Sequence, residues 1–123
     1  MAEPFADRLT AIVEQRSSQV VLGLDPNPAR LWPQARIVVD QVAGGSAAGQ
    51  EPGGTATVTR SAAVELRKAL GRAYFMHCAA AIDAAGPACV AIKPQLACFE
   101  RLGADGWAAV SYTHLTLPTI YSV

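Results

Sequence analysis

The sequence has little charge of either sign, few cysteines and no long hydrophobic run. Only 16% of its 123 residues are charged, and ten basic residues balance ten acidic ones to give a formal net charge of zero. Without a basic excess there is no general attraction to nucleic acid or to an anionic membrane surface, so the expected partner is a small molecule. No apolar segment approaches the length that crosses a bilayer, and the first residues lack the pattern of a leader peptide. We therefore expect a cytoplasmic protein that binds neither nucleic acid nor membrane.

The three cysteines are odd in number and lack the close pairing of a zinc site or a CxxC motif. Cys78, Cys89 and Cys98 each lie in apolar surroundings. The sequence therefore predicts buried free thiols in a reducing compartment, and no metal site.

Apolar residues make up 51% of the chain, and two apolar runs end alike, with a charged residue followed by proline. The run VVLGL precedes Asp25 and Pro26, and the run CVAI precedes Lys93 and Pro94. The first run lacks alternation, which is typical of a strand buried on both faces, and Gly23 within it indicates close packing or a backbone approached by a ligand. If the two strands are parallel neighbours, Asp25 and Lys93 lie at their carboxyl ends about 5 Å apart across the sheet, where α/β enzymes place their chemistry.

Two helices are indicated by the spacing of apolar residues. The first is predicted over residues 5–16, with acidic and basic residues placed as the helix dipole prefers. The second is predicted over residues 62–85, with Ser61 as its N-cap and Gly86 followed by Pro87 at its end.

The remaining segments are predicted to be a loop, an insertion and the start of a further helix. Three prolines make residues 25–33 a loop, and a helix is expected to begin within residues 96–102. Residues 40–60 are rich in glycine and alanine and bury too little apolar surface to offset their ordering entropy, so we expect a disordered insertion there. The order strand, helix, strand predicts an α/β fold with parallel strands.

The candidate residues also have ordinary structural explanations. Asp25 before a proline is commonly a turn former, and Lys93 at a strand end can extend its stem to solvent or meet a carboxylate. Cys98 and His77 could be imagined as nucleophile and base, but no third orienting group accompanies them, so a packed thiol and an incidental histidine are preferred. Glu100 is interpreted as an acid on a helix surface.

Three short motifs carry a resemblance to a known family. The octet KPQLACFE at residues 93–100, the segment LGLDP at residues 22–26 and IDAAGP at residues 82–87 resemble the amino-terminal part of orotidine 5'-phosphate decarboxylases of the actinobacterial and mycobacterial type. The resemblance covers residues 5–110 apart from the insertion. It implies about two β/α units of a TIM (β/α)8 barrel, in a lyase that converts orotidine 5'-phosphate to UMP and CO2 in pyrimidine biosynthesis. It also implies a homodimer that uses neither a metal nor an organic cofactor.

The resemblance further implies roles for two residues. Asp25 looks like the aspartate that contacts the ribose of the substrate, and Lys93 looks like the lysine of a charged network that stabilises the carbanion formed when CO2 leaves. The family's Asp-x-Lys-x-x-Asp motif, which supplies the proton-donating lysine, does not occur in this chain. Because a closed barrel usually needs about 250 residues, we expect a truncated decarboxylase that is inactive as it stands.

Residues 111–123 differ in composition from the rest of the chain. Threonine, proline and tyrosine replace the earlier alanine, glycine and arginine, and SYTHLTLPT resembles tails found on unrelated truncated reading frames. We expect a foreign segment in which His114 has no role; a strand-forming tail is the alternative, although Pro118 interrupts it.

Two alternatives to the decarboxylase remain open from the sequence. One is a related barrel that acts on a sugar phosphate. The other is a small non-catalytic α/β binding module in which Asp25 and Lys93 form only a structural ion pair.

Overall fold

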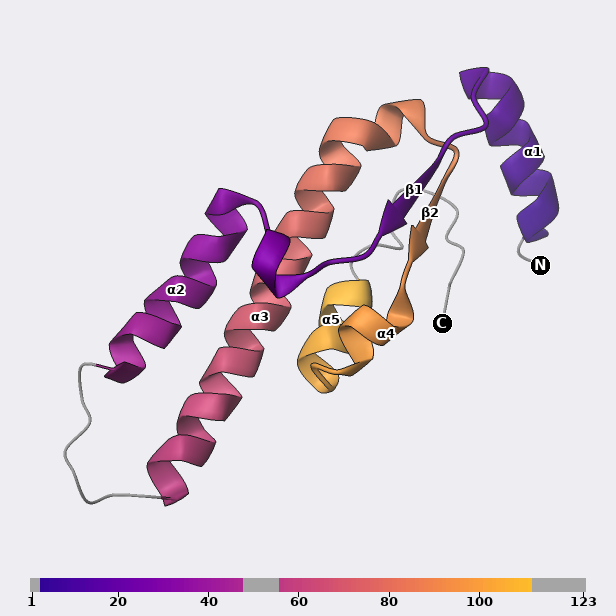
Figure 1. Cartoon of the computed structure of the whole chain (residues 1–123). Coiled ribbons are helices and arrows are strands. Elements are labelled where there is room, and N and C mark those ends of the chain that lie inside the picture. Colours follow the sequence, from indigo (N-terminus) through magenta and orange to yellow (C-terminus); the bar gives the residue numbers. More distant parts are fainter. Residues whose placement is uncertain (1–2, 48–55, 112–123) are drawn as a thin grey trace.

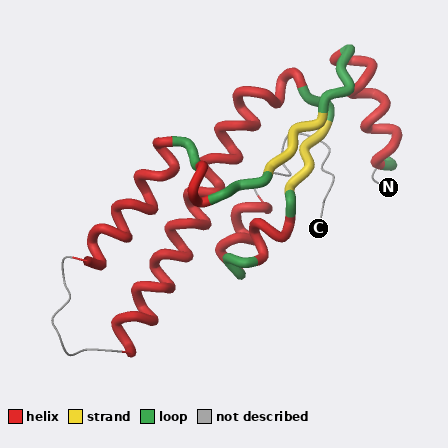
Figure 2. Tube along the Cα trace, in the orientation of Figure 1, coloured by secondary structure: helices red, strands yellow, loops and turns green. Residues whose placement is uncertain are grey.

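The computed structural model describes residues 3–47 and 56–111, which form a short parallel sheet among helices (Figures 1 and 2). In chain order the elements are α1 (Phe5–Arg16), β1 (Val21–Leu24), the 3-10 turn η1 (Pro28–Arg30), α2 (Pro33–Ala47), α3 (Ala56–Ala85), the 3-10 turn η2 (Gly86–Ala88), β2 (Ala91–Pro94), α4 (Leu96–Glu100) and α5 (Ala104–Ser111). This mixture is compatible with the predicted α/β fold. Within the described ranges, none of the helices combines the length and the apolar character needed to span a membrane.

The sheet confirms the prediction that the two apolar runs are neighbouring parallel strands. Strands β1 and β2 pair in parallel, with Gly23 opposite Lys93. The ladder continues past the strand ends, where the backbone N–H of Gln95 donates to the carbonyl oxygen of Leu24 at 3.0 Å. Both strands therefore present their carboxyl ends at the same edge of the sheet.

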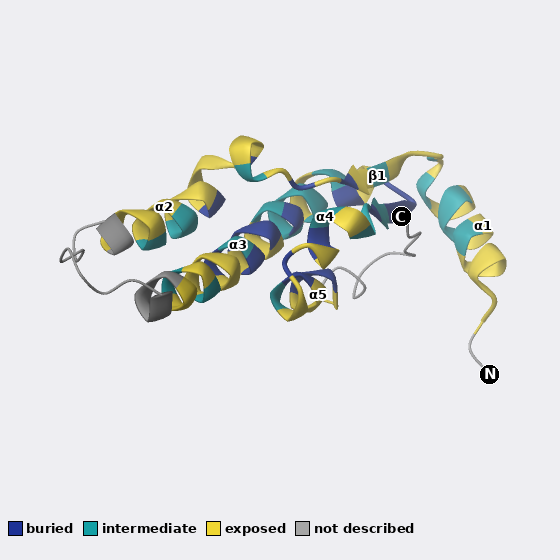
Figure 3. Ribbon diagram, turned by 60° about the horizontal axis from the view of Figure 1, so that its bottom comes forward, coloured by how far each residue is buried: buried dark blue, intermediate teal, exposed yellow. Residues whose placement is uncertain are grey.

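The core lies where one face of the sheet meets α3, α4 and α5 (Figure 3). Its centre is an edge-to-face pair between Tyr74 of α3 and Phe99 of α4, with ring centroids 5.9 Å apart. Ile92 of β2 is fully buried and Leu24 of β1 is 3% exposed, so both strands contribute to it. Burying these apolar side chains is the main stabilising contribution to this arrangement.

The expectation that the first strand is buried on both faces is wrong. Val21 is 43% exposed, whereas Leu24, on the opposite face of the strand, is buried. Side chains alternate between the two faces of a strand, and the core cluster of the described residues lies on the face that carries Leu24 and Ile92. An apolar run without alternation therefore gave no information about which face would be covered.

Helix α1 has the predicted bounds and is joined to the far end of α3 by one side chain. The guanidinium Nη1 of Arg16 donates to the carbonyl oxygens of Gly86 and Cys89, at 2.5 and 2.6 Å. Helix α3 ends at Ala85 as predicted, and Gly86 begins the turn η2. The arginine in the last turn of α1 therefore supplies donors to carbonyls that precede β2.

The region between the strands differs from the sequence expectation. Residues 40–47, expected in a disordered insertion, lie in α2, and α3 begins at Ala56, so Ser61 lies inside this helix rather than at its N-cap. Helix α2 lies alongside α3 (Figure 1), with Ala35 buried and Val39 half-buried. Tertiary contact therefore stabilises a helix whose glycine-rich end has weak propensity. Residues 48–55 lie outside the described ranges.

After β2 the chain forms two short helices instead of one. Helix α4 ends at Glu100, Gly103 has a positive φ of 62° that suits the turn, and α5 follows. A Cβ on Gly106 would lie 1.9 Å from the carbonyl oxygen of Phe99, so α5 approaches α4 at a distance that only glycine permits. The segment predicted to be foreign lies outside the described residues beyond Ser111.

Candidate functional site

The candidate site is the carboxyl edge of the sheet. Asp25 directly follows β1, and Lys93 is the third residue of β2. Each is followed by a buried proline, Pro26 or Pro94. A proline has no backbone N–H to continue a ladder, which is consistent with the strands ending here.

The register corrects the predicted spacing of the two charged residues. Lys93 lies opposite Gly23, so Asp25 is two residues further along than the position that faces the lysine. Strand spacing and rise then give a Cα separation of about 8 Å rather than about 5 Å. No ion pair joins the two side chains within the described residues.

Lys93 shares its face of the sheet with Gly23, the residue opposite it. Residues two apart on a strand point to the same side, and residues opposite each other in a parallel pair do so as well. On this face Gly23 is exposed and Lys93 is half-buried, whereas Ala91, two residues before Lys93, is fully buried. The close packing expected at Gly23 is not found, because a Cβ placed there would have no described atom within 4 Å.

The charge of Asp25 also affects the pKa of a buried cysteine in the adjoining core. The pKa of the Cys78 thiol is raised from 9.0 to about 12, first by burial and then by the nearby Cys98 and Asp25. Cys78 therefore remains a protonated thiol near neutral pH. The prediction of free thiols is confirmed for Cys78, Cys89 and Cys98, of which Cys98 is only half-buried.

His77 has a partner that the sequence did not indicate. Its Nδ1 accepts a hydrogen bond from the backbone N–H of Trp32 at 3.1 Å, and the two rings meet edge to face with centroids 5.9 Å apart. Burial lowers the pKa of His77 below its usual value of 6.5. No local pattern could have revealed this contact, because the two residues are 45 positions apart.

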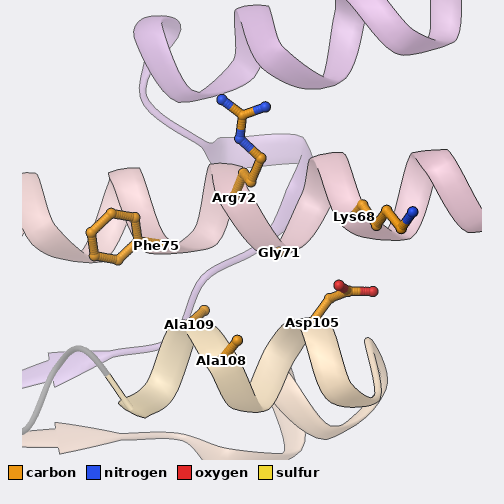
Figure 4. Close-up of a pocket in the computed structure, with 7 residues that line it drawn as sticks. All are labelled: Lys68, Gly71, Arg72, Phe75, Asp105, Ala108 and Ala109. Atoms are coloured by element: carbon orange, nitrogen blue, oxygen red, sulfur yellow. The ribbon is translucent and has the colours of Figure 1, made fainter.

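Two pockets of the described structure are lined by residues other than Asp25 and Lys93. One pocket of about 430 Å³ lies between α3 and α5 (Figure 4) and is lined by Lys68, Gly71, Arg72, Phe75, Asp105, Ala108 and Ala109. Another of about 320 Å³ lies beside the start of α2, next to Trp32. Across the described ranges, no group of histidine, cysteine and carboxylate side chains is arranged to hold a metal ion.

Comparisons with known proteins give one partial match. No protein-family model and no solved structure matches the chain. Among curated proteins, the chain is similar to an orotidine 5'-phosphate decarboxylase of Christiangramia forsetii, with 42% identity over 48 residues. The matched part is 36% of this chain and 18% of the relative, so the chain matches less than a fifth of the relative's length. The match is a partial likeness to one member of that enzyme family, which acts in pyrimidine biosynthesis, and the subfamily stays a prediction.

Proposed function

We propose that this chain supplies the first β/α units of an orotidine 5'-phosphate decarboxylase, with Asp25 and Lys93 in its substrate site. The proposal is supported by the partial match to the Christiangramia forsetii enzyme. The observation that carries it is the parallel pairing of β1 and β2, because Asp25 directly follows β1 and Lys93 lies near the carboxyl end of β2. The carboxyl ends of parallel strands are where barrel enzymes place their active sites.

The proposed chemistry is electrostatic. Asp25 would accept hydrogen bonds from the ribose hydroxyls, and Lys93 would place a fixed positive charge near the carbon that becomes a carbanion as CO2 leaves. Charges that are held in place before the reaction stabilise developing charge more than mobile water does. The strand on which Lys93 lies is buried at Ile92 and Pro94, and such packing is what holds a charge rigidly.

The proposal places the proton donor elsewhere. The chain contains no Asp-x-Lys-x-x-Asp motif, so the residues that complete the reaction would come from further β/α units. Under this proposal the chain alone does not convert substrate. A homodimer in the cytoplasm and a reaction without metal or organic cofactor remain predictions that belong to the same proposal.

A chimera with the relative tests the proposal. Residues 5–110 would replace the corresponding amino-terminal part of the Christiangramia forsetii enzyme, and release of CO2 from orotidine 5'-phosphate would be measured. We expect an active chimera in which Asp25→Asn and Lys93→Met each lower kcat/KM by about 100-fold or more, because each removes a charge from the site. Lys68→Met is the matched control, because Lys68 is an exposed lysine on α3.

The outcomes separate the proposal from its alternatives. A chimera that melts cooperatively but releases no CO2 from orotidine 5'-phosphate contradicts the proposal. If such a chimera acts instead on another sugar phosphate, the related-barrel alternative is favoured. If the chain binds no phosphorylated ligand and Asp25→Asn or Lys93→Met changes only its stability, the non-catalytic module is favoured.

A further inference from the structure

The loop between β1 and α2, residues 25–32, is held to α3 at its far end. Asp25 begins the loop and Trp32 ends it, immediately before α2 starts at Pro33. The backbone N–H of Trp32 donates to Nδ1 of His77 at 3.1 Å, and the indole meets the imidazole at an interplanar angle of 80°. Among the described residues, this is the only hydrogen bond from the loop to α3.

The rest of the loop is organised by its own local bonds. The side-chain oxygen of Asn27 accepts from the backbone N–H of Ala29 at 3.0 Å, and its carbonyl oxygen accepts from that of Arg30 at 2.9 Å. The carbonyl oxygen of Trp32 accepts from Arg36 within the first turn of α2. The loop is therefore a preformed unit. It is held to α3 by the hydrogen bond to His77 and by Leu31, which is buried in the core cluster that includes Tyr74 and Cys78 of α3.

This contact depends on the protonation of His77. A neutral imidazole accepts at Nδ1 only while its proton is on Nε2, and an imidazolium has two donors and no acceptor. Protonation would therefore turn the Nδ1 acceptor into a donor that faces the N–H of Trp32. Burial lowers the pKa of His77, so the accepting form prevails at neutral pH.

The surroundings of His77 offer little to hold an imidazolium. The charged and titratable groups on the elements around this part of α3 are Asp25 and Arg30 of the loop, Arg36 and Asp40 of α2, Arg72, Tyr74, Cys78 and Asp83 of α3 itself, Cys98 and Glu100 of α4 with Arg101 after it, and Asp105 of α5. Arg36 and Asp40 pair with each other at 3.8 Å, and the Tyr74 hydroxyl accepts from Arg101 at 3.0 Å. No carboxylate forms an ion pair with His77 in the described part of the chain.

We propose that His77 is a pH-sensitive positioning residue: the neutral side chain holds the loop that begins at Asp25 against α3, and the protonated side chain releases the Trp32 end of that loop. The consequence for substrate binding through Asp25 rests on the proposed function. The contact between His77 and the loop does not rest on the proposed function, because it involves only the loop, His77 and α3.

Tryptophan fluorescence of the whole chain tests whether protonation of His77 releases the Trp32 end of the loop. Trp107→Phe leaves Trp32 as the sole tryptophan. On lowering the pH from about 8 to about 5, we expect quenching of Trp32 by acrylamide to rise about twofold in a one-proton transition, because the released indole becomes more accessible. The midpoint should lie below 6.5, the usual pKa of histidine.

Two further variants identify the titrating group. His77→Gln keeps a side-chain acceptor that does not titrate, so quenching should stay low across the pH range. His114→Gln, the matched control at the chain's other histidine, should keep the transition unchanged. The proposal is overturned if the transition persists in His77→Gln. It is also overturned if the Trp107→Phe chain, in which Trp32 is the sole tryptophan, shows no transition.

Nitrogen NMR of the unsubstituted chain covers the case in which His77→Gln does not fold. The His77 ring should carry its proton on Nε2 at about pH 7.5, as an Nδ1 acceptor requires. A ring protonated on Nδ1, or one that exchanges equally between both forms, overturns the proposal. None of these measurements uses a substrate. An inactive chimera would therefore overturn the proposed function without contradicting the pH-sensitive contact between His77 and the loop.

Discussion

The two faces of the parallel sheet have opposite characters. On the covered face, Leu24 and Ile92 are almost fully buried in a core shared with α3, α4 and α5. On the open face, Val21 is 43% exposed and Lys93 is half-buried, and only Ala91, opposite Val21, is fully buried. The comparison shows that the large buried side chains of the two strands lie on one face, whereas the other face carries Lys93 and a partly exposed valine.

Truncating one apolar residue on each face should give the largest contrast. Ile92→Ala leaves a cavity in the core and is expected to lower the free energy of unfolding by about 2–5 kcal/mol. Val21→Ala, on the open face of the paired strand, should cost less than about 1 kcal/mol. Urea unfolding followed by circular dichroism measures both, and equal losses would show that the open face is covered in solution.

Adding one methyl group on each side should give a smaller contrast. Gly106→Ala places a Cβ against the carbonyl oxygen of Phe99 in the helical layer, and is expected to cost about 1–3 kcal/mol. Gly23→Ala adds the same group on the open face, where no described atom lies within 4 Å, and should change stability by less than about 0.5 kcal/mol. The same urea titration applies, and a larger loss at Gly23 than at Gly106 contradicts the comparison.

The buried thiol of Cys78, in the core on the covered face, should give the smallest effect on stability. This effect appears only at alkaline pH. The pKa of Cys78 is about 12 in the folded chain and 9.0 ordinarily, so the unfolded chain loses this proton first as the pH rises. Its contribution to stability is therefore complete below about pH 9 and is lost between about pH 9 and about pH 12. Cys78→Val should remove that part of the alkaline loss.

Unfolding midpoints near pH 8 and near pH 10.5 measure this effect. The difference between the two pH values should be smaller in Cys78→Val than in the unsubstituted chain, and an identical difference argues against a buried thiol. Cys89→Val is the matched control, because Cys89 is also a buried free cysteine and is not among the groups that raise the pKa of Cys78.

Local signals were sufficient for several elements. The apolar spacing and end charges of α1 predicted its bounds, and glycine followed by proline predicted the end of α3 at Ala85. Both rest on interactions within a few residues along the chain, which a sequence displays directly. The pairing of the two strands was predicted from their similar ends, and it is confirmed in direction.

Features that depend on distant residues were not predicted. The helical state of residues 40–47 depends on packing against α3, and composition alone indicated disorder. The offset of Asp25 from Lys93 depends on the strand register, which is set by how the helices seat each strand. The acceptor for the Trp32 N–H depends on His77, 45 positions away.

The sequence by itself determined which segments became strands and where charged residues would end them, because these choices follow from local propensity, proline and apolar content. Tertiary structure alone decided which face of the sheet is covered, which residue faces Lys93 across the strands, and that His77 holds the loop after β1. These properties arise from burial and hydrogen bonding between segments far apart in the chain, and no local pattern encodes them.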